Sequence, residues 1–313
     1  MTLRAFLPLL ALAAAMGCQN KDATPSAGTT DPASSAAAPN PAAAAPSGSA
    51  AAGPAAAFPV GIPRPASDVA KIINPRGEEP YRGPTAKLKG TVRIKGDPPP
   101  SMDLTFPVGK CGEAAATYGK LFRVGLEGAA ADVLVAVTGY KGFVPQREEA
   151  EKTTLHGCAF ARRTMAVAFG QRVEVSNLDQ LESYMPYLDG APKKAVMVAV
   201  PRGEAVKLFP MEPGHYMLRD ELPKPFLHAD VFVLAYATHD VTGLDGQYEI
   251  SGIPVGDVVV NAFLPTIDKT VEQRITLKEG DNALDLTLEY TASKDGADAK
   301  KAGSEAKPGD KKP

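Results

Sequence analysis

Apolar and polar residues alternate on both sides of a Gly-Gln pair near the middle of the chain, and this pattern limits the possible folds most strongly. In MAVAFGQRVEVSN (165–177), Met, Val and Phe occupy every second position before and after the pair. Such alternation is typical of half-buried antiparallel strands, because successive side chains point to opposite faces of a sheet. Other segments of strand length that alternate or are continuously apolar are 88–94, 102–111, 121–126, 131–137, 195–200, 205–209, 216–218, 229–235, 270–277 and 282–290. The sequence therefore predicts an all-β protein.

Composition and charge exclude several classes of function. The 313-residue chain has a formal net charge of −2, which argues against strong electrostatic binding to nucleic acid. It contains no His-Glu-x-x-His, no Gly-x-Ser-x-Gly and no phosphate-binding Gly-rich loop. A hydrolytic carboxylate pair could be drawn from Asp179, Glu182 and Asp189, but acidic residues are common in loops. We therefore expect a protein that is not an enzyme.

The N-terminal segment 1–18 has the pattern of an export signal. It contains a basic residue, a short apolar run and Ala-Met-Gly directly before Cys18. This ending resembles the lipobox of bacterial lipoproteins, in which the cysteine carries the lipid and anchors the chain to a membrane. The alternative is an ordinary signal peptide with an incidental cysteine. Gln19 after the cysteine favours, by resemblance to enterobacterial sorting, a lipid-anchored protein of the bacterial cell envelope at the outer membrane.

Two segments have compositions that do not support a packed core. Residues 19–65 are rich in Ala, Pro, Ser and Gly, and residues 291–313 mix Lys, Asp, Ala and Gly. Such segments bury too little apolar surface to offset their conformational entropy. We expect a disordered stalk and a disordered tail.

The two other cysteines, Cys111 and Cys158, form an even pair once Cys18 is set aside. In an oxidising compartment a disulfide is the expected state of such a pair. Two free buried thiols are the alternative.

Several short motifs resemble those of cupredoxin-like domains. These are Cys111-Gly112, Gly157-Cys158-Ala159-Phe160, the Gly170-Gln171 turn and the strand exit Asn177-Leu178-Asp179. The resemblance implies a cupredoxin-like Greek-key β-sandwich over residues 66–237. In copper-binding relatives, the segment after the strand exit carries a His ligand, and a later loop supplies Cys, His and often Met.

The segments that match these ligand positions lack the ligands. Residues 181–186 contain no His, and residues 220–228 contain His228 but neither Cys nor Met. A blue-copper site needs two imidazoles and a thiolate, so the scaffold is expected to have lost its copper and to hold no cofactor. His215 and His228, with acidic neighbours, are weak candidates for another metal site.

A second resemblance covers residues 238–290. Asp245-Gly246 predicts a tight hairpin turn, and Ile253-Pro254-Val255-Gly256 predicts a turn before an apolar strand. Together they resemble a carboxypeptidase-regulatory-like (transthyretin-like) segment, in which the motif is structural.

Tyr184, Met185 and Tyr187 form a small aromatic and thioether cluster at the expected loop end. If exposed, they are a recognition patch; if buried, they fill the space that copper ligands occupy in relatives. We therefore expect a non-catalytic, lipid-anchored envelope module that binds an unknown envelope protein or glycan. The alternative is a periplasmic copper-binding or electron-transfer protein with an atypical site.

Overall fold

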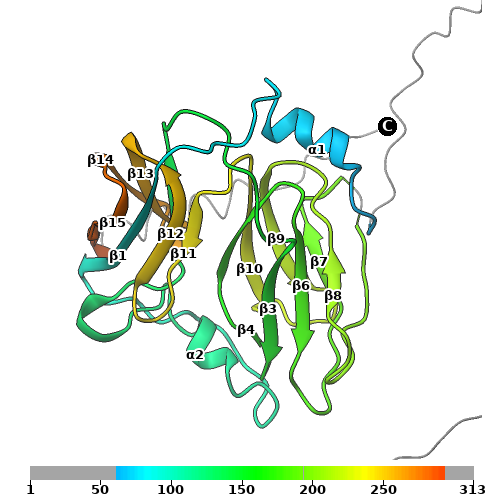
Figure 1. Cartoon of the computed structure of the whole chain (residues 1–313). Coiled ribbons are helices and arrows are strands. Elements are labelled where there is room, and N and C mark those ends of the chain that lie inside the picture. The colour runs from blue at the N-terminus through cyan, green and yellow to red at the C-terminus, as the bar shows by residue number, and fades with distance from the viewer. Residues whose placement is uncertain (1–60, 193, 293–313) are drawn as a thin grey trace, which may run out of the picture. The chain divides into compact units, whose positions relative to one another are not determined.

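The computed structural model describes residues 61–192 and 194–292, and the regular structure within these ranges is mostly β-strand (Figure 1). The all-β class predicted from the alternating segments is confirmed. The helices are α1 (Ala66–Ile73), α2 (Ala114–Tyr118), η1 (Leu126–Gly128) and η2 (Pro265–Ile267). The strands are β1 (Thr85–Gly96), β2 (Leu134–Thr138), β3 (Ala150–His156), β4 (Ala159–Phe160), β5 (Thr164–Ala168), β6 (Arg172–Asn177), β7 (Pro186–Asp189), β8 (Val206–Leu208), β9 (Gly214–Asp220), β10 (His228–Leu234), β11 (His239–Val241), β12 (Gln247–Pro254), β13 (Gly256–Leu264), β14 (Lys269–Leu277), β15 (Gly280–Ala283) and β16 (Leu286–Tyr290).

Some predictions concern residues outside the described ranges. The signal segment, Cys18, the stalk up to residue 60 and the tail from residue 293 lie there, and the statements about them stay predictions. No helix within the described ranges has the length and apolar character needed to cross a membrane.

Strands β3 to β10 form two four-stranded sheets, which we call the inserted sandwich. One sheet has the order β5-β10-β9-β7 and the other the order β4-β3-β6-β8. Each sheet contains one parallel pair, β5 with β10 and β3 with β6, and its other pairs are antiparallel. Fully buried side chains such as Met165, Phe160 and Leu218 fill the core. This arrangement is a two-sheet β-sandwich, as the sequence predicts for this part of the chain.

The prediction of an antiparallel pair across Gly170-Gln171 is wrong. β5 pairs with β10, whereas β6 pairs with β3 and β8, so the turn carries the chain from one sheet to the other. Gly170 has a φ of 104°, a conformation that glycine adopts without strain. Alternation specifies which side chains of a strand are buried but not which strand is its neighbour.

The remaining strands form a second sandwich, which we call the split sandwich. Its sheets have the orders β12-β1-β15, with β16 also paired to β1, and β11-β2-β13-β14. Figure 1 shows β1, in cyan, beside strands drawn in yellow and orange. Residues 85–96 and 134–138 were expected within the 66–237 region, but they pair with strands that follow residue 238. The inserted sandwich thus lies, in sequence, between β2 and β11 of the split sandwich.

One close approach in the split sandwich requires glycine. The amide of Val92 in β1 donates to the carbonyl of Gly246 at 2.8 Å, and Gly246 has a φ of 69°. A Cβ atom on Gly246 would lie 2.6 Å from the Val92 carbonyl oxygen. The Asp245-Gly246 turn is therefore held directly against β1.

The two sandwiches pack against each other through apolar side chains. Ala166 and Phe232 of the inserted sandwich contact Leu134 and Val241 of the split sandwich. The ring of Phe232 also meets that of Phe263 edge-on, with 5.7 Å between the centroids. Because this face is covered, all residues of β5 are buried, which explains why half-burial was the wrong expectation for this strand.

Several segments differ from their predicted conformation. Residues 102–111, 121–126 and 195–200, which were expected as strands, form none. The segment that precedes β1 contains α1, whose Val69 packs on the core of the inserted sandwich beside Gly170. In segment 102–111, Phe106 packs on the inserted core, with its ring centre 5.0 Å from that of Phe226, whereas Met102, Leu104 and Val108 are exposed.

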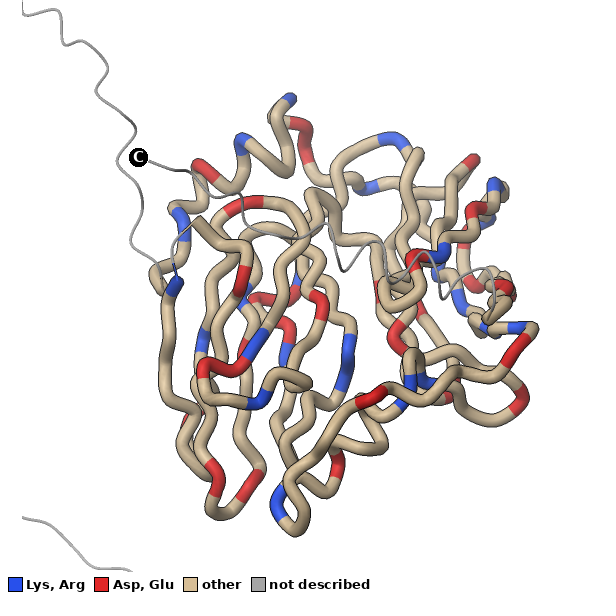
Figure 2. The backbone as a smooth tube through the Cα atoms, turned by 180° about the vertical axis from the view of Figure 1, so that it is seen from behind, with Lys and Arg blue, Asp and Glu red and all other residues tan. Residues whose placement is uncertain are grey.

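Charged residues are mixed in sign over the described chain. Figure 2 shows Lys and Arg positions interleaved with Asp and Glu positions along the backbone of both sandwiches. Several form exposed pairs, such as Lys87 with Glu249 at 2.9 Å. Such pairs contribute little to stability but leave no broad field of one sign.

Candidate functional site

The loop end of the inserted sandwich holds the segments in which the resemblance places copper ligands, and a buried tyrosine lies at its centre. Tyr184 has no exposed surface. Its hydroxyl donates to Asp179 Oδ2 and accepts from the amide of Cys158 at 3.1 Å. Asp179 Oδ1 accepts from the amide of Gly157 at 2.9 Å. Burial, followed by the hydrogen bond to Asp179, raises the pKa of Tyr184, so the phenol stays protonated at neutral pH.

The second ligand segment contains a buried ion pair in place of a metal ligand. The side chain of Asp220 is 1% exposed, and its Oδ1 accepts from the amide of Met185 at 2.7 Å. Lys224 Nζ lies 3.4 Å from Asp220 Oδ2 and 4.9 Å from the centre of the Tyr184 ring. The lysine therefore compensates the buried carboxylate and joins the two loop segments.

A disulfide joins Cys111 to Cys158 at the same end. The bridge that the even cysteine pair predicts is thus present. Both sulfur atoms are used in it, so neither residue offers a thiolate. The bridge also ties the end of segment 102–111 to Cys158, whose amide donates to the hydroxyl of Tyr184.

The two weak metal candidates are far apart. In the antiparallel β9–β10 pair, His228 is opposite Arg219 and His215 is opposite Phe232, so the histidines are separated by about 13 Å along the strands. His215 Nε2 lies 2.7 Å from Asp230 Oδ1, and its ring stacks on Phe232. Within the described ranges, no three His, Cys, Asp or Glu side chains are grouped to hold a metal ion.

His228 has an environment of its own. Its ring lies 5.7 Å from the ring of Tyr118. Burial lowers the pKa of His228, and the positive charge of Arg163 lowers it further. The side chain is therefore neutral at pH 7 and packs beside the ring of Tyr118.

The three residues of the proposed recognition patch do not form one exposed surface. Tyr184 is buried, whereas Met185 and Tyr187 are half-buried. Lys194 Nζ lies 3.8 Å from the centre of the Tyr187 ring. For Tyr184, the structure therefore favours the alternative in which the buried ring fills the loop end over the exposed recognition patch.

Sequence reasoning missed an exposed apolar surface beside Tyr184, which we call the aliphatic rim: Leu178, Leu181, Met197, Val198 and Val200. Leu181 is 90% exposed, and the others are 45–53% exposed. The two segments of the rim are tied together, since Tyr184 and Ala199 exchange main-chain hydrogen bonds and Asn177 Nδ2 donates to Ala199 O at 2.8 Å. The sequence feature that could have indicated this surface is the run AVMVAV (195–200), which is apolar but forms no strand.

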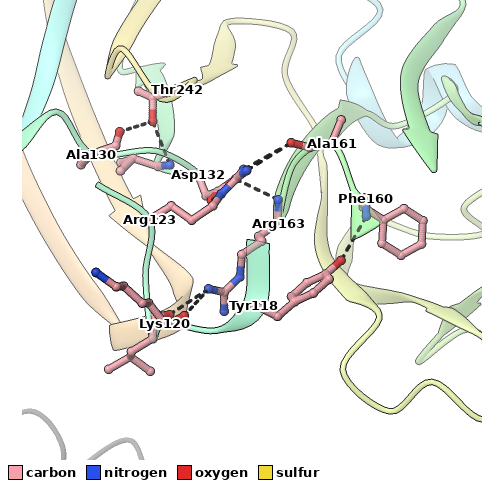
Figure 3. Close-up of polar contacts among 11 residues, drawn as sticks. Tyr118, Lys120, Arg123, Ala130, Asp132, Phe160, Ala161, Arg163 and Thr242 are labelled. Carbon is pink, nitrogen blue, oxygen red and sulfur yellow. Dashed lines mark hydrogen bonds and ion pairs between the residues drawn. The ribbon is translucent and has the colours of Figure 1, made fainter. Parts of the chain in front are cut away.

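Sequence reasoning also missed a buried polar network that connects the sandwiches (Figure 3). Arg123 binds Asp132 with two hydrogen bonds, of 2.7 and 2.6 Å, and also reaches the carbonyl of Ala161. The amide of Arg163 donates to Asp132 Oδ1 at 2.8 Å, and Arg163 Nη1 donates to the carbonyl of Lys120 at 3.0 Å. The Asp132 carboxylate is thus fully engaged by groups of the fold, which marks the network as structural.

Comparisons with known proteins give only weak likeness. No protein-family model matches the chain, and no curated protein matches it. A reduced amicyanin mutant is 18% identical with a TM-score of 0.24, covering 27% of this chain and 82% of amicyanin. A copper-containing nitrite reductase from Thermus scotoductus is 18% identical with a TM-score of 0.25, covering 31% of this chain and 24% of the reductase. At these values the likeness carries no argument about function.

Proposed function

We propose that this chain is a non-catalytic, lipid-anchored module of the bacterial envelope, built on a cupredoxin-like scaffold that has lost its copper site. The observation that carries the proposal is the hydrogen-bonded filling of the loop end. Tyr184 and the Asp220–Lys224 pair occupy the two segments where relatives would bind metal. The polar groups of these three side chains already have partners within the protein.

The hydrogen bonds that engage the carboxylates at the loop end also support a non-catalytic role. Catalytic acids and bases need a free face toward a substrate, together with a pKa suited to proton transfer. Asp179 and Asp220 are instead held by main-chain amides. The acids Asp179, Glu182 and Asp189 do not act as one pair in this proposal, because Asp179 binds Tyr184 while Asp189 binds Arg219.

The kind of partner is suggested by the aliphatic rim. An exposed apolar patch on a soluble protein is typical of a protein-binding surface, and the rim contains no aromatic ring on which a sugar could stack. The ion pair between Lys110 and Glu182, at 3.2 Å, neutralises both charges beside Leu181. We propose an envelope protein as the partner, with a glycan as the less favoured choice.

The remaining parts have supporting roles in this proposal. Cys18 carries the lipid, and segment 19–65 is the stalk between the membrane and the folded chain. The split sandwich corresponds to the carboxypeptidase-regulatory-like segment, completed by β1 and β2, and acts as a structural support. The expected location is the outer membrane.

Metal binding is the first test. The purified, oxidised full chain is mixed with Cu(II), dialysed, and measured for copper content and visible absorption. We expect no stoichiometric copper and no intense absorption band from a copper–thiolate bond. Tight, stoichiometric copper that is lost in His215→Gln or His228→Gln would contradict the proposal and revive the copper-binding alternative.

The anchor is tested separately. The Cys18→Ser variant is expected to leave the membrane fraction, while the unchanged chain stays in it and carries the mass of an acylated N-terminus. A chain that fractionates with membranes without Cys18 would show that the lipid is not its anchor.

A further inference from the structure

A cleft between the two sandwiches has properties that the proposed function does not use. It is enclosed by the segment that follows β2, by β3, by the β5–β6 turn and by the chain around β11 and β12, with about 200 Å³ of free space. Its polar lining residues are Gln146, Arg147, Glu148, Glu151, Gln171, His239 and Ser251. Clefts at the junction of two folded units are common places for small ligands.

Glu151 is the anionic group on the β3 wall of this cleft. Its side chain is 30% exposed, and the nearest cation is Arg162, whose Nη1 lies 3.6 Å away. Among the described residues it receives no hydrogen bond from a side chain or amide at ordinary distance. Burial raises the pKa of Glu151, the positive charge of Arg162 partly opposes this effect, and the negative charge of Asp240 adds to it. The carboxylate is therefore incompletely compensated.

Arg147 supplies the opposite charge. It is exposed, and no hydrogen bond or ion pair joins it to the described part of the chain. Its guanidinium lies against the main chain of β12 at Gly252, where an added Cβ atom would be 2.5 Å from Nη2. Gly252 also has a φ of 75°, so glycine is favoured there by both the backbone and the space for Arg147.

The main chain between these two charges is fixed by hydrogen bonds. The carbonyl of Glu148 accepts from Gln146 Nε2 at 2.7 Å and from Gln171 Nε2 at 3.2 Å. Gln171 Oε1 accepts from the amide of Ala168 at 2.6 Å. The wall of the cleft is therefore positioned before any ligand arrives, which lowers the entropy cost of binding.

The lining residue His239 adds no charge at neutral pH. Its Nδ1 lies 3.2 Å from the carbonyl of Tyr236. Burial lowers the pKa of His239, against the opposite effect of neighbouring carbonyls. The carboxylate of Glu148 is exposed at the rim. The charges that face a ligand are thus those of Glu151 and Glu148 and the cation of Arg147.

We propose that this cleft binds a small zwitterion of the α-amino-acid class, with its ammonium group toward Glu151 and its carboxylate toward Arg147. Guanidinium groups bind carboxylates with two parallel hydrogen bonds, and an ammonium group supplies the donors that Glu151 lacks. The free space is smaller than the roughly 300–1,000 Å³ of pockets for drug-sized ligands, and it suits a single amino acid. The site is separate from the loop end, so it adds to the proposed function.

Isothermal titration of the full chain tests the proposal with four probes: L-alanine, L-leucine, L-glutamate and L-lysine. We expect saturable binding of at least one probe. The N-acetyl and amide derivatives of that probe, which lack the ammonium charge and the carboxylate charge respectively, are each expected to bind about tenfold or more weakly, since a lost charge-assisted hydrogen bond is worth about that factor.

Variants locate the site. Arg147→Gln and Glu151→Gln are each expected to weaken binding by about tenfold or more. Arg274→Gln, which removes an exposed arginine of β14, is the matched control and should leave affinity unchanged. Gly252→Ala places a methyl group against the guanidinium and should weaken binding while leaving both charges present. Circular dichroism establishes that each variant is folded.

Two results would overturn the proposal. The first is the absence of saturable binding for all four probes. The second is binding that Arg147→Gln and Glu151→Gln leave unchanged. Either result is independent of copper binding and of the lipid anchor, so it is distinguishable from a failure of the proposed function.

Discussion

Replacing Asp132 by Asn tests whether the buried polar network holds the sandwiches together. The side chains of Asp132 and Arg123 are 2% and 13% exposed, and two hydrogen bonds of 2.7 and 2.6 Å join them. The substitution removes the negative charge but keeps the size of the side chain. Asn also tolerates the left-handed backbone at this position, where φ is 64°. The change therefore isolates the effect of charge.

The size of the effect follows from the partners that remain. Breaking a buried ion pair by removing one member costs about 3–5 kcal/mol, because the other charge is left without compensation. Arg123 keeps weak bonds to the carbonyl of Ala161, at 3.3 and 3.4 Å, which reduces the loss. We expect Asp132→Asn to lower the free energy of unfolding by about 3 kcal/mol, a large share of the roughly 5–15 kcal/mol of a typical domain.

Urea unfolding of the full chain, followed by far-UV circular dichroism, measures this loss, since the chain has no Trp for fluorescence. Glu127→Gln is the control. Glu127 pairs with Arg93 at the surface and is 83% exposed, so its loss should cost less than about 1 kcal/mol. A loss below about 1 kcal/mol for Asp132→Asn would falsify the reasoning, because it would mean that solvent or a shifted side chain compensates Arg123.

Three further predictions concern stability. Replacing Cys111 and Cys158 by Ser should lower the free energy of unfolding by about 4 kcal/mol, given a sequence separation of 47, and a change below about 1 kcal/mol in urea would contradict this. Because the pKa of His239 is lowered on folding, the unfolded chain takes up a proton below about pH 6.5 that the folded chain does not, so stability should fall as the pH falls from about 7.5 to 5.5. His239→Gln should reduce that fall, and an unchanged pH profile would show that this residue does not cause it. Gly246→Ala should lower the melting temperature more than Gly77→Ala, because both positions have positive φ but only Gly246 lies against the main chain of β1; equal shifts would argue against the contact.

Local patterns in the sequence predicted individual strands well. Residues 88–94 and 229–235 were expected as strands from their alternation and apolar character. The first range lies within β1, and the second coincides with β10 to within one residue at each end. The disulfide between Cys111 and Cys158 followed from the even cysteine pair. These features depend on residue spacing and on cysteine count, which a single sequence displays directly.

Partners across long sequence separations could not be predicted. The alternation in β1 is the same whether its neighbour is β2 or β16, so the pattern contains no information about pairing. Arg123 and Asp132 lie in an irregular segment, and only the folded chain shows that they meet Arg163. The sequence drew attention to residues 181–186 and 220–228, but the Asp220–Lys224 pair depends on burial, which a loop sequence does not reveal.

The split sandwich can be completed only late in synthesis, because it combines strands from both ends of the described chain. Val92 of β1 pairs with Leu286 of β16, so β1 emerges early but lacks this neighbour until nearly all of the described chain has been made. Until then, one edge of β1 is an unpaired template for other strands, and such edges favour aggregation. The strands of the inserted sandwich, in contrast, lie within a continuous segment from Ala150 to Leu234 and do not depend on β16. We therefore expect a shortened chain that ends before Leu286 to leave β1 exposed and to require a chaperone or be degraded.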